Sequence, residues 1–206
     1  HDARNAFSRL IAGGFVHAVL AGNALATHDL EAAYPQHCSG AEHLHAGKSA
    51  QRALQPSGHH QPGAGFHGID SPPFVESGAD SKIGILHTCE RHGVPYILAG
   101  SIRDDGPLPP VLADVYAAQD AMRAEIRSAT TVICMATALH TIAAGNMTPS
   151  YRVLADGTVR QVYFYCVDIS EFAVNKLSDR GSLSARGIVT NVQDFIVHLS
   201  KELIQP

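Results

Sequence analysis

The segment 94–110, V-P-Y-I-L-A-G-S-I-R-D-D-G-P-L-P-P, places the strongest constraint on the fold of this chain. Its first six residues form a short apolar run, partly β-branched, which predicts a buried strand. A polar loop with the adjacent acids Asp104 and Asp105 follows, and two prolines can open the next helix. Open α/β sheets bind ligands at such loops, outside the carboxyl ends of their strands. A solvated loop is the alternative, but two adjacent carboxylates repel each other unless a ligand uses them, so we favour a site.

The rest of the chain alternates expected strands with expected helices. Apolar or β-branched runs predict strands at 15–20, 94–99, 130–136, 162–167 and 187–190. Helices are expected from residue 23 onwards, and at 111–128, 170–177 and 192–203. Gly93 is expected to cap the carboxyl end of a further segment, and an Asp-Gly pair predicts a surface hairpin over 152–160. This alternation predicts an α/β fold with a doubly wound parallel sheet.

Five turns follow these strands, and each carries a residue suited to a ligand: Gly22, Asp105, His140, Asp168 and Asn191. Right-handed crossovers would place all five turns along one rim of the sheet. This convergence is the main physical argument for a shared binding site.

Several of these positions also have a purely structural explanation. The helix after Asn23 would present its N–H groups to a phosphate or carboxylate, although a strand-to-helix turn without a ligand is the more common case. His140 is either a buried, hydrogen-bonded histidine or a residue of the site. Asp168 either accepts hydrogen bonds from ribose hydroxyls or caps the next helix.

Residues 34–80 differ in composition from the rest of the chain. They lose apolar periodicity and are rich in His, Gly, Pro, Ser and Gln. The histidines lack the spacing and carboxylate support of a metal site, so we expect no metal here. A disordered or poorly packed insert is the favoured interpretation.

Composition excludes several functional classes. A net charge of −4 argues against a nucleic-acid surface, and no apolar run is long enough to span a membrane. The four cysteines form no C-x-x-C pair; Cys134 and Cys166 lie in apolar runs and are expected to be buried thiols in a reducing, cytoplasmic protein. The first residues include no methionine and do not form a signal peptide, so a fragment of a longer chain is expected.

Four ordered motifs carry a family resemblance. They read G-N-A-L-A-T-H-D-L-E, P-Y-I-L-A-G-S-I-R-D-D-G-P-L-P, A-T-A-L-H-T-I-A-A-G-N-M, and V-D-I-S…K-L-S-D-R-G-S…G-I-V-T-N-V. Together they resemble the archaeal-type ornithine cyclodeaminases, and the carboxyl-terminal part of the cyanobacterial arginine dihydrolase/ornithine cyclodeaminases. This group is often described as related to lysine-ketoglutarate reductase/saccharopine dehydrogenase (LOR/SDH). The resemblance covers residues 15–31 and 83–203, and the family's amino-terminal domain is expected to be missing.

The resemblance implies a single Rossmann-like NAD domain over residues 1–206, similar in arrangement to deoxyhypusine synthase. It implies conversion of L-ornithine to L-proline and ammonia, with the hydride taken and returned by bound NAD. A homo-oligomer is also expected. Asp104, Asp105 and His140 are the candidate catalytic residues. Carried over by motif, the NAD-binding residues are Asn23, Ala24, Asp105, Thr137, Ala138, Leu139, His140, Asp168, Asn191 and Val192. The family usually has aspartate where Asn191 stands.

The sequence also departs from the family in the segment 34–80. The family carries there a small-residue loop and a G-H-x-N-H stretch, neither of which is present. A reading of this segment out of frame is one hypothesis, which resequencing of the gene tests. Two other functions stay open: a non-catalytic NAD-binding or regulatory module, and an amino-acid oxidoreductase similar to saccharopine dehydrogenase.

Overall fold

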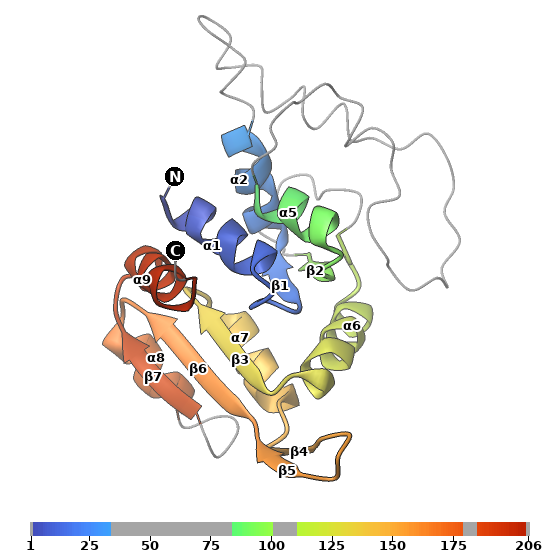
Figure 1. The fold of residues 1–206 in the computed structure, drawn as a ribbon. Helices are drawn as coiled ribbons and strands as arrows, with labels where there is room; N and C mark the ends of the chain where they lie inside the picture. The colour runs from blue at the N-terminus through green and yellow to red at the C-terminus, as the bar shows by residue number, and fades with distance from the viewer. Residues whose placement is uncertain (1, 34–83, 101–110, 179–184, 205–206) are drawn as a thin grey trace, which may run out of the picture. The chain divides into compact units, whose positions relative to one another are not determined.

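The computed structural model describes residues 2–33, 84–100, 111–178 and 185–204 (Figure 1). The chain divides into two compact units, which meet between Ala118 and Gln119 in the sequence. Each unit contains parallel strands joined by helices, which confirms the predicted α/β class. The described strands pair as one parallel sheet in each unit and one separate hairpin. No helix in the described part of the chain has both the length and the apolar character needed to cross a lipid bilayer.

The amino-terminal unit is built around two parallel strands. Its elements are α1 (Asp2–Ala12), β1 (Val19–Gly22), α2 (Asn23–Ala33), α5 (Ile85–His92) and β2 (Tyr96–Ala99). Val19 pairs with Tyr96 and Gly22 with Ala99, so both strands end at the same edge. Leu112 returns to this edge, where its N–H donates to the Leu98 carbonyl at 2.8 Å.

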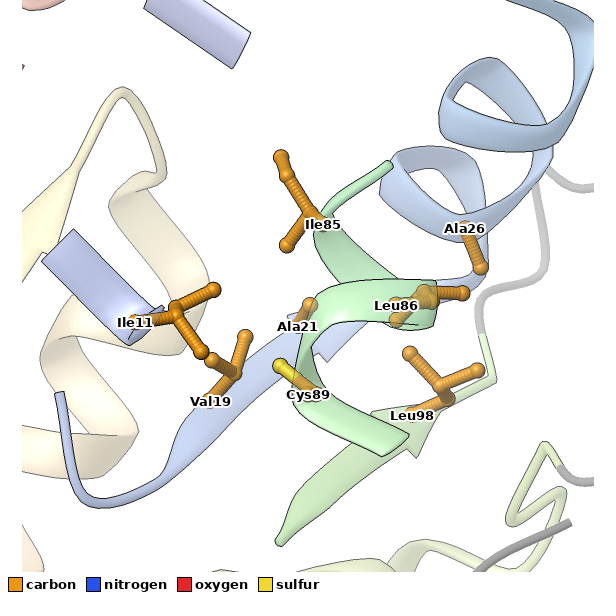
Figure 2. Close-up of a cluster of buried hydrophobic side chains, with 8 residues drawn as sticks. All are labelled: Ile11, Val19, Ala21, Ala26, Ile85, Leu86, Cys89 and Leu98. Carbon is orange, nitrogen blue, oxygen red and sulfur yellow. The ribbon is translucent and has the colours of Figure 1, made fainter. Parts of the chain in front are cut away.

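The core of this unit lies between the two strands and the helices (Figure 2). Ile85, Leu86 and Cys89 project from one side of α5, as expected for residues one turn apart on an amphipathic helix. The cluster consists of Ile11, Val19, Ala21, Ala26, Ile85, Leu86, Cys89 and Leu98. Gly93 ends α5 in the left-handed conformation (φ 64°), which confirms the predicted cap.

An ion pair between the half-buried Arg4 and the buried Asp29 connects α1 and α2, and the same aspartate binds α5. The Arg4 Nε donates to Asp29 Oδ1 at 2.6 Å, and the Leu86 amide donates to Asp29 Oδ2 at 3.0 Å. One carboxylate therefore binds both a guanidinium and the free amide end of α5. A side chain at Gly84 would lie about 3 Å from both charged groups, since a Cβ there would be 3.0 Å from Arg4 Nη2 and 3.1 Å from Asp29 Oδ2.

The carboxyl-terminal unit contains a three-stranded parallel sheet in the order β3-β6-β7. With α6, whose range begins just before the unit boundary, its elements are α6 (Val115–Ser128), β3 (Thr131–Met135), α7 (Ala138–Met147), β4 (Tyr151–Val153), β5 (Val159–Gln161), β6 (Tyr163–Asp168), α8 (Glu171–Ser178), β7 (Ala185–Val189) and α9 (Val192–Leu203). Cys134, Cys166 and Gly187 are register partners on one face of this sheet. Helices α7 and α8 cover that face, where Ile142 and Val174 pack on Cys166.

The observed boundaries correct two sequence predictions. The strand expected at 15–20 begins only at Val19, and α1 was not predicted. The helix expected at 111–128 begins at Val115, because Leu112 pairs with Ala99 and the Asp114 carboxylate accepts the Ala117 amide at 2.7 Å. The predicted hairpin is confirmed as β4 and β5.

Candidate functional site

Three strand ends meet along one edge of the β3-β6-β7 sheet. The strands are parallel neighbours, so their carboxyl ends coincide. The Ala136 amide donates to the Val167 carbonyl, and the Thr190 amide donates to the Asp168 carbonyl, both at 3.0 Å. These bonds hold the three turns that follow the strands side by side.

The turn from β3 into α7 has an unusual backbone. Ala136 has φ of 51°, in the left-handed region that alanine rarely adopts. Thr137 then precedes the helix in an extended conformation, and among the described residues no side chain caps α7. The Thr141 hydroxyl donates to the Thr137 carbonyl and fixes this turn. The first amides of α7 therefore point out of the helix without a side-chain acceptor, as in helix ends that bind phosphate.

The first turn of α7 also contains three of the predicted site residues. Ala138 and Leu139 are exposed, and His140 is half-buried. The position of His140 excludes the fully buried alternative but does not by itself assign a function to the imidazole.

Asp168 ends β6 next to this turn. Its Oδ1 accepts the Ser170 amide at 2.8 Å, while the Ser170 hydroxyl accepts the Ala173 amide at 3.3 Å. Ser170, rather than Asp168, is therefore the capping residue of α8. With Oδ1 engaged in the turn, Oδ2 of the half-buried Asp168 is the oxygen suited to a ligand hydroxyl.

Asn191 and Val192 follow β7 at the same edge. The Asn191 Oδ1 accepts the Gln193 amide at 2.8 Å, so this side chain caps α9. A ligand contact by Asn191 would have to use its side-chain N–H₂ group or its backbone. The aspartate usual in the family would have an oxygen at that position instead.

Two thiols lie beneath the edge, on the helix-covered face. Burial raises the pKa of Cys134 to about 12, although a hydrogen bond with Thr141 opposes the rise. Burial also raises the pKa of Cys166, and the negative charge of Asp168 adds to this effect. Both thiols are buried and free, as the sequence predicted, and both stay protonated at neutral pH.

The amino-terminal unit has its own strand edge. Asn23 and Ala24 open α2 directly after β1; Asn23 is buried and Ala24 is exposed. The Gly100 amide donates to the Leu112 carbonyl at 2.9 Å, so the chain leaves and rejoins this edge beside β2. Asp104 and Asp105 lie between these two points, outside the described residues.

The structure thus brings together two groups of the predicted residues, one in each unit. Thr137 to His140, Asp168, Asn191 and Val192 share one edge, while Asn23 and Ala24 lie at the other. Convergence of both edges on one ligand stays a prediction. The left-handed turn at Ala136, which leads into α7, was not predicted, because no sequence signal marks an alanine in this conformation. Within the described ranges, no three His, Cys, Asp or Glu side chains form a group that could hold a metal ion.

Comparison with known proteins gives consistent matches over almost the whole chain. The family described as "Arginine dihydrolase ArgZ-like, C-terminal, Rossmann fold" matches residues 1–199. The ornithine cyclodeaminase of Methanococcus maripaludis is 39% identical over 201 residues, which are 96% of this chain and 45% of that protein.

Two solved structures have a similar fold. A conserved LOR/SDH protein from Methanococcus maripaludis has a TM-score of 0.75 at 38% identity, covering 98% of this chain and 57% of that one. The ternary complex of AgrE with ornithine and NAD+ has a TM-score of 0.73 at 32% identity, covering 98% and 28%. The chain therefore spans about half the length, or less, of these relatives.

Proposed function

Since this chain belongs to the family of carboxyl-terminal Rossmann-fold domains of ArgZ-like arginine dihydrolases, we propose that it is the NAD-binding part of an ornithine cyclodeaminase. One observation carries the proposal: an uncapped helix end and a carboxylate lie side by side at the end of a parallel sheet. The AgrE complex with ornithine and NAD+ supports the choice of ligand.

The amino end of α7 is suited to bind the pyrophosphate of the dinucleotide. The amides of Ala138 and Leu139, together with the helix dipole, favour a negative group at this point. Ala136 holds the turn in a conformation that costs about 1 kcal/mol, and such strain is concentrated at functional sites. The Thr137 hydroxyl is a further donor at this position.

Asp168 is suited to a ribose. Its free oxygen can accept from ribose hydroxyls, as acids at strand ends do in dinucleotide-binding sheets. Asn191 and Val192, one strand further along, would contact the same ligand. Asn23 and Ala24 are proposed as contacts from the other unit.

The reaction requires a hydride carrier, which protein side chains are not. A bound nicotinamide supplies that chemistry, and the protein supplies binding and orientation. We propose His140 as the side chain beside the nicotinamide. Asp104 and Asp105 are proposed to bind the ammonium groups of ornithine or to exchange protons with them. The protonated thiols of Cys134 and Cys166 take no part.

The test uses the full chain with L-ornithine and NAD+. Proline and ammonia should form without net accumulation of NADH, since the hydride returns to the product. NADH that accumulates would instead indicate an amino-acid oxidoreductase, and NAD binding without turnover would indicate a binding module. Failure to bind NAD+ would refute all three.

A matched pair of variants locates the binding site. Asp168→Asn should weaken NAD+ binding about 10- to 100-fold, because it removes a charged acceptor. Asp156→Asn is the control: Asp156 accepts the Thr158 amide in the exposed hairpin turn of the same unit, away from the proposed site. Calorimetric titration of both variants measures the difference, and equal affinities would remove Asp168 from the site.

A further inference from the structure

A buried hydroxyl group lies directly behind the turn that leads into α7. It belongs to Thr141, which is only 2% exposed. The Thr141 hydroxyl donates a hydrogen bond to the carbonyl of Thr137, the residue that precedes the helix. This hydrogen bond therefore connects the body of α7 to the turn.

The neighbours of this hydroxyl group fix the direction of its hydrogen bonds. A carbonyl oxygen only accepts, so the single proton of the Thr141 hydroxyl points to Thr137. The Cys134 thiol on β3 shares a second hydrogen bond with Thr141. Burial raises the pKa of this thiol to about 12, so the thiol keeps its proton and donates it to the hydroxyl oxygen. The two hydrogen bonds are compatible, and together they link β3 to the turn.

The Thr137 carbonyl in turn sets the direction of the next amide. A trans peptide unit is planar, so the Thr137 carbonyl and the Ala138 N–H point in opposite directions. Because Thr141 holds the carbonyl towards the body of the helix, the Ala138 N–H is held outwards at the amino end of α7. This N–H is one of the amides proposed above to bind the pyrophosphate.

The turn needs such support because its backbone is strained. Ala136 has φ of 51°, a conformation that alanine rarely adopts. A strained turn persists only where the surrounding contacts hold it. On one side the Ala136 amide donates to the Val167 carbonyl at 3.0 Å, and on the other the Thr141 hydroxyl holds the Thr137 carbonyl.

We propose that Thr141 is a positioning residue for the dinucleotide, a role that rests on the proposed NAD function. Its side chain is almost fully buried, so it acts through the peptide unit between Thr137 and Ala138. The Cys134 thiol supports the same hydroxyl group from behind, although it takes no part in the reaction. A donor that is already oriented binds its ligand more tightly, because it need not be ordered when the ligand arrives.

A purely structural role is the alternative, since threonine hydroxyls in helices can bond to the carbonyl four residues earlier. Helix α7 offers a matched control at its other end. There the Thr148 hydroxyl donates to the Ala144 carbonyl at 2.7 Å, and Thr148 is buried as well. Thr148 therefore makes the same kind of hydrogen bond on the same helix, but at the carboxyl end.

The test compares Thr141→Val with Thr148→Val by calorimetric titration of the full chain with NAD+. Valine has nearly the shape of threonine and lacks the hydroxyl group. Thr141→Val should weaken NAD+ binding about tenfold, because an amide that faces a charged group is no longer held in place. Thr148→Val should change the affinity by less than about twofold. Circular dichroism of both variants verifies that they are folded.

Fragments of the cofactor separate positioning from a general loss of structure. ADP contains the pyrophosphate, whereas adenosine contains no phosphate. Thr141→Val should weaken ADP binding about as much as NAD+ binding, and should leave adenosine binding, followed by nuclear magnetic resonance, unchanged.

A second pair of variants gives the same test if the valine variant does not fold. Thr141→Ser and Thr141→Ala both lose the methyl group and differ only in the hydroxyl group. The serine variant should bind NAD+ within about threefold of the unaltered chain, and the alanine variant about tenfold more weakly than the serine variant.

Three results would overturn the positioning role of Thr141. The first is equal NAD+ affinity with and without the hydroxyl group, the second is equal weakening by Thr148→Val, and the third is a loss of adenosine binding as large as that of ADP. An unaltered chain that does not bind NAD+ would instead refute the proposed function, and the positioning role with it.

Discussion

Replacing Gly187 by alanine is the most direct test of how α8 lies on the sheet. An ideal Cβ at Gly187 would be 2.1 Å from Cγ1 of Val174, whereas carbon atoms normally meet at about 3.5–4.0 Å. Val174 is only 4% exposed and packs on Cys166 and Ile142, so it has little room to move. The added methyl group must therefore displace α8 or force a strained rotamer.

The expected cost follows from overpacking. Inserting a methyl group into a filled core costs about 1–3 kcal/mol. We expect Gly187→Ala to lower the free energy of unfolding by about 2 kcal/mol. The backbone itself accepts alanine, because Gly187 is not in the left-handed region.

A second variant, at Val174, shows whether the loss in Gly187→Ala comes from overlap with the Val174 methyl group. Val174→Ala removes the overlapping methyl group and should alone cost about 2 kcal/mol, from lost burial and a small cavity. In the double variant the new methyl group occupies the vacated space, so the total loss should be near 2 kcal/mol instead of the additive 4. The coupling energy is therefore about 2 kcal/mol.

Urea unfolding followed by far-ultraviolet circular dichroism measures all four proteins, since the chain contains no tryptophan for fluorescence. Protein concentration is held constant, because assembly adds to apparent stability. Losses that add to within about 0.5 kcal/mol would refute the packing of α8 on β7 described here.

Other residues give sharp expectations. Asp29→Asn removes the charge that faces the half-buried Arg4 guanidinium, so the free energy of unfolding measured in urea should fall by about 2 kcal/mol; a loss under about 0.5 kcal/mol would contradict the observed pair. The pKa of the Cys134 thiol is about 12 in the folded chain and 9.0 when the thiol is exposed, so burial of the protonated thiol contributes to the free energy of unfolding below pH 9. This contribution should be lost as the pH rises from 9 towards 12, and Cys134→Ala should make the fall of the free energy of unfolding with pH less steep. Ala136→Gly should raise the free energy of unfolding by up to about 1 kcal/mol, and the melting temperature with it, because glycine adopts φ of 51° without strain. A lower melting temperature would contradict the observed turn.

The local features of the fold could be predicted from the sequence because local interactions produce them. Gly93 as a helix cap and the hairpin turn depend on residues within one turn of each other, and both are confirmed. The capping of α9 by Asn191 is equally local. The alternation of apolar runs with amphipathic segments also predicted the parallel α/β class, which the observed strand pairing confirms.

Long-range contacts decided the rest. Nothing near Asp29 in the sequence indicates that its carboxylate binds the amide of Leu86, 57 residues away, because only chain folding brings them together. Leu112 illustrates the same limit, since pairing with Ala99 overrode a helical pattern. Tertiary packing likewise set the left-handed turn at Ala136, at a residue whose own preference is the opposite. The sequence alone thus determined most of the strands and turns, while the tertiary structure decided which segments meet, because a contact between distant residues depends on every segment that separates them.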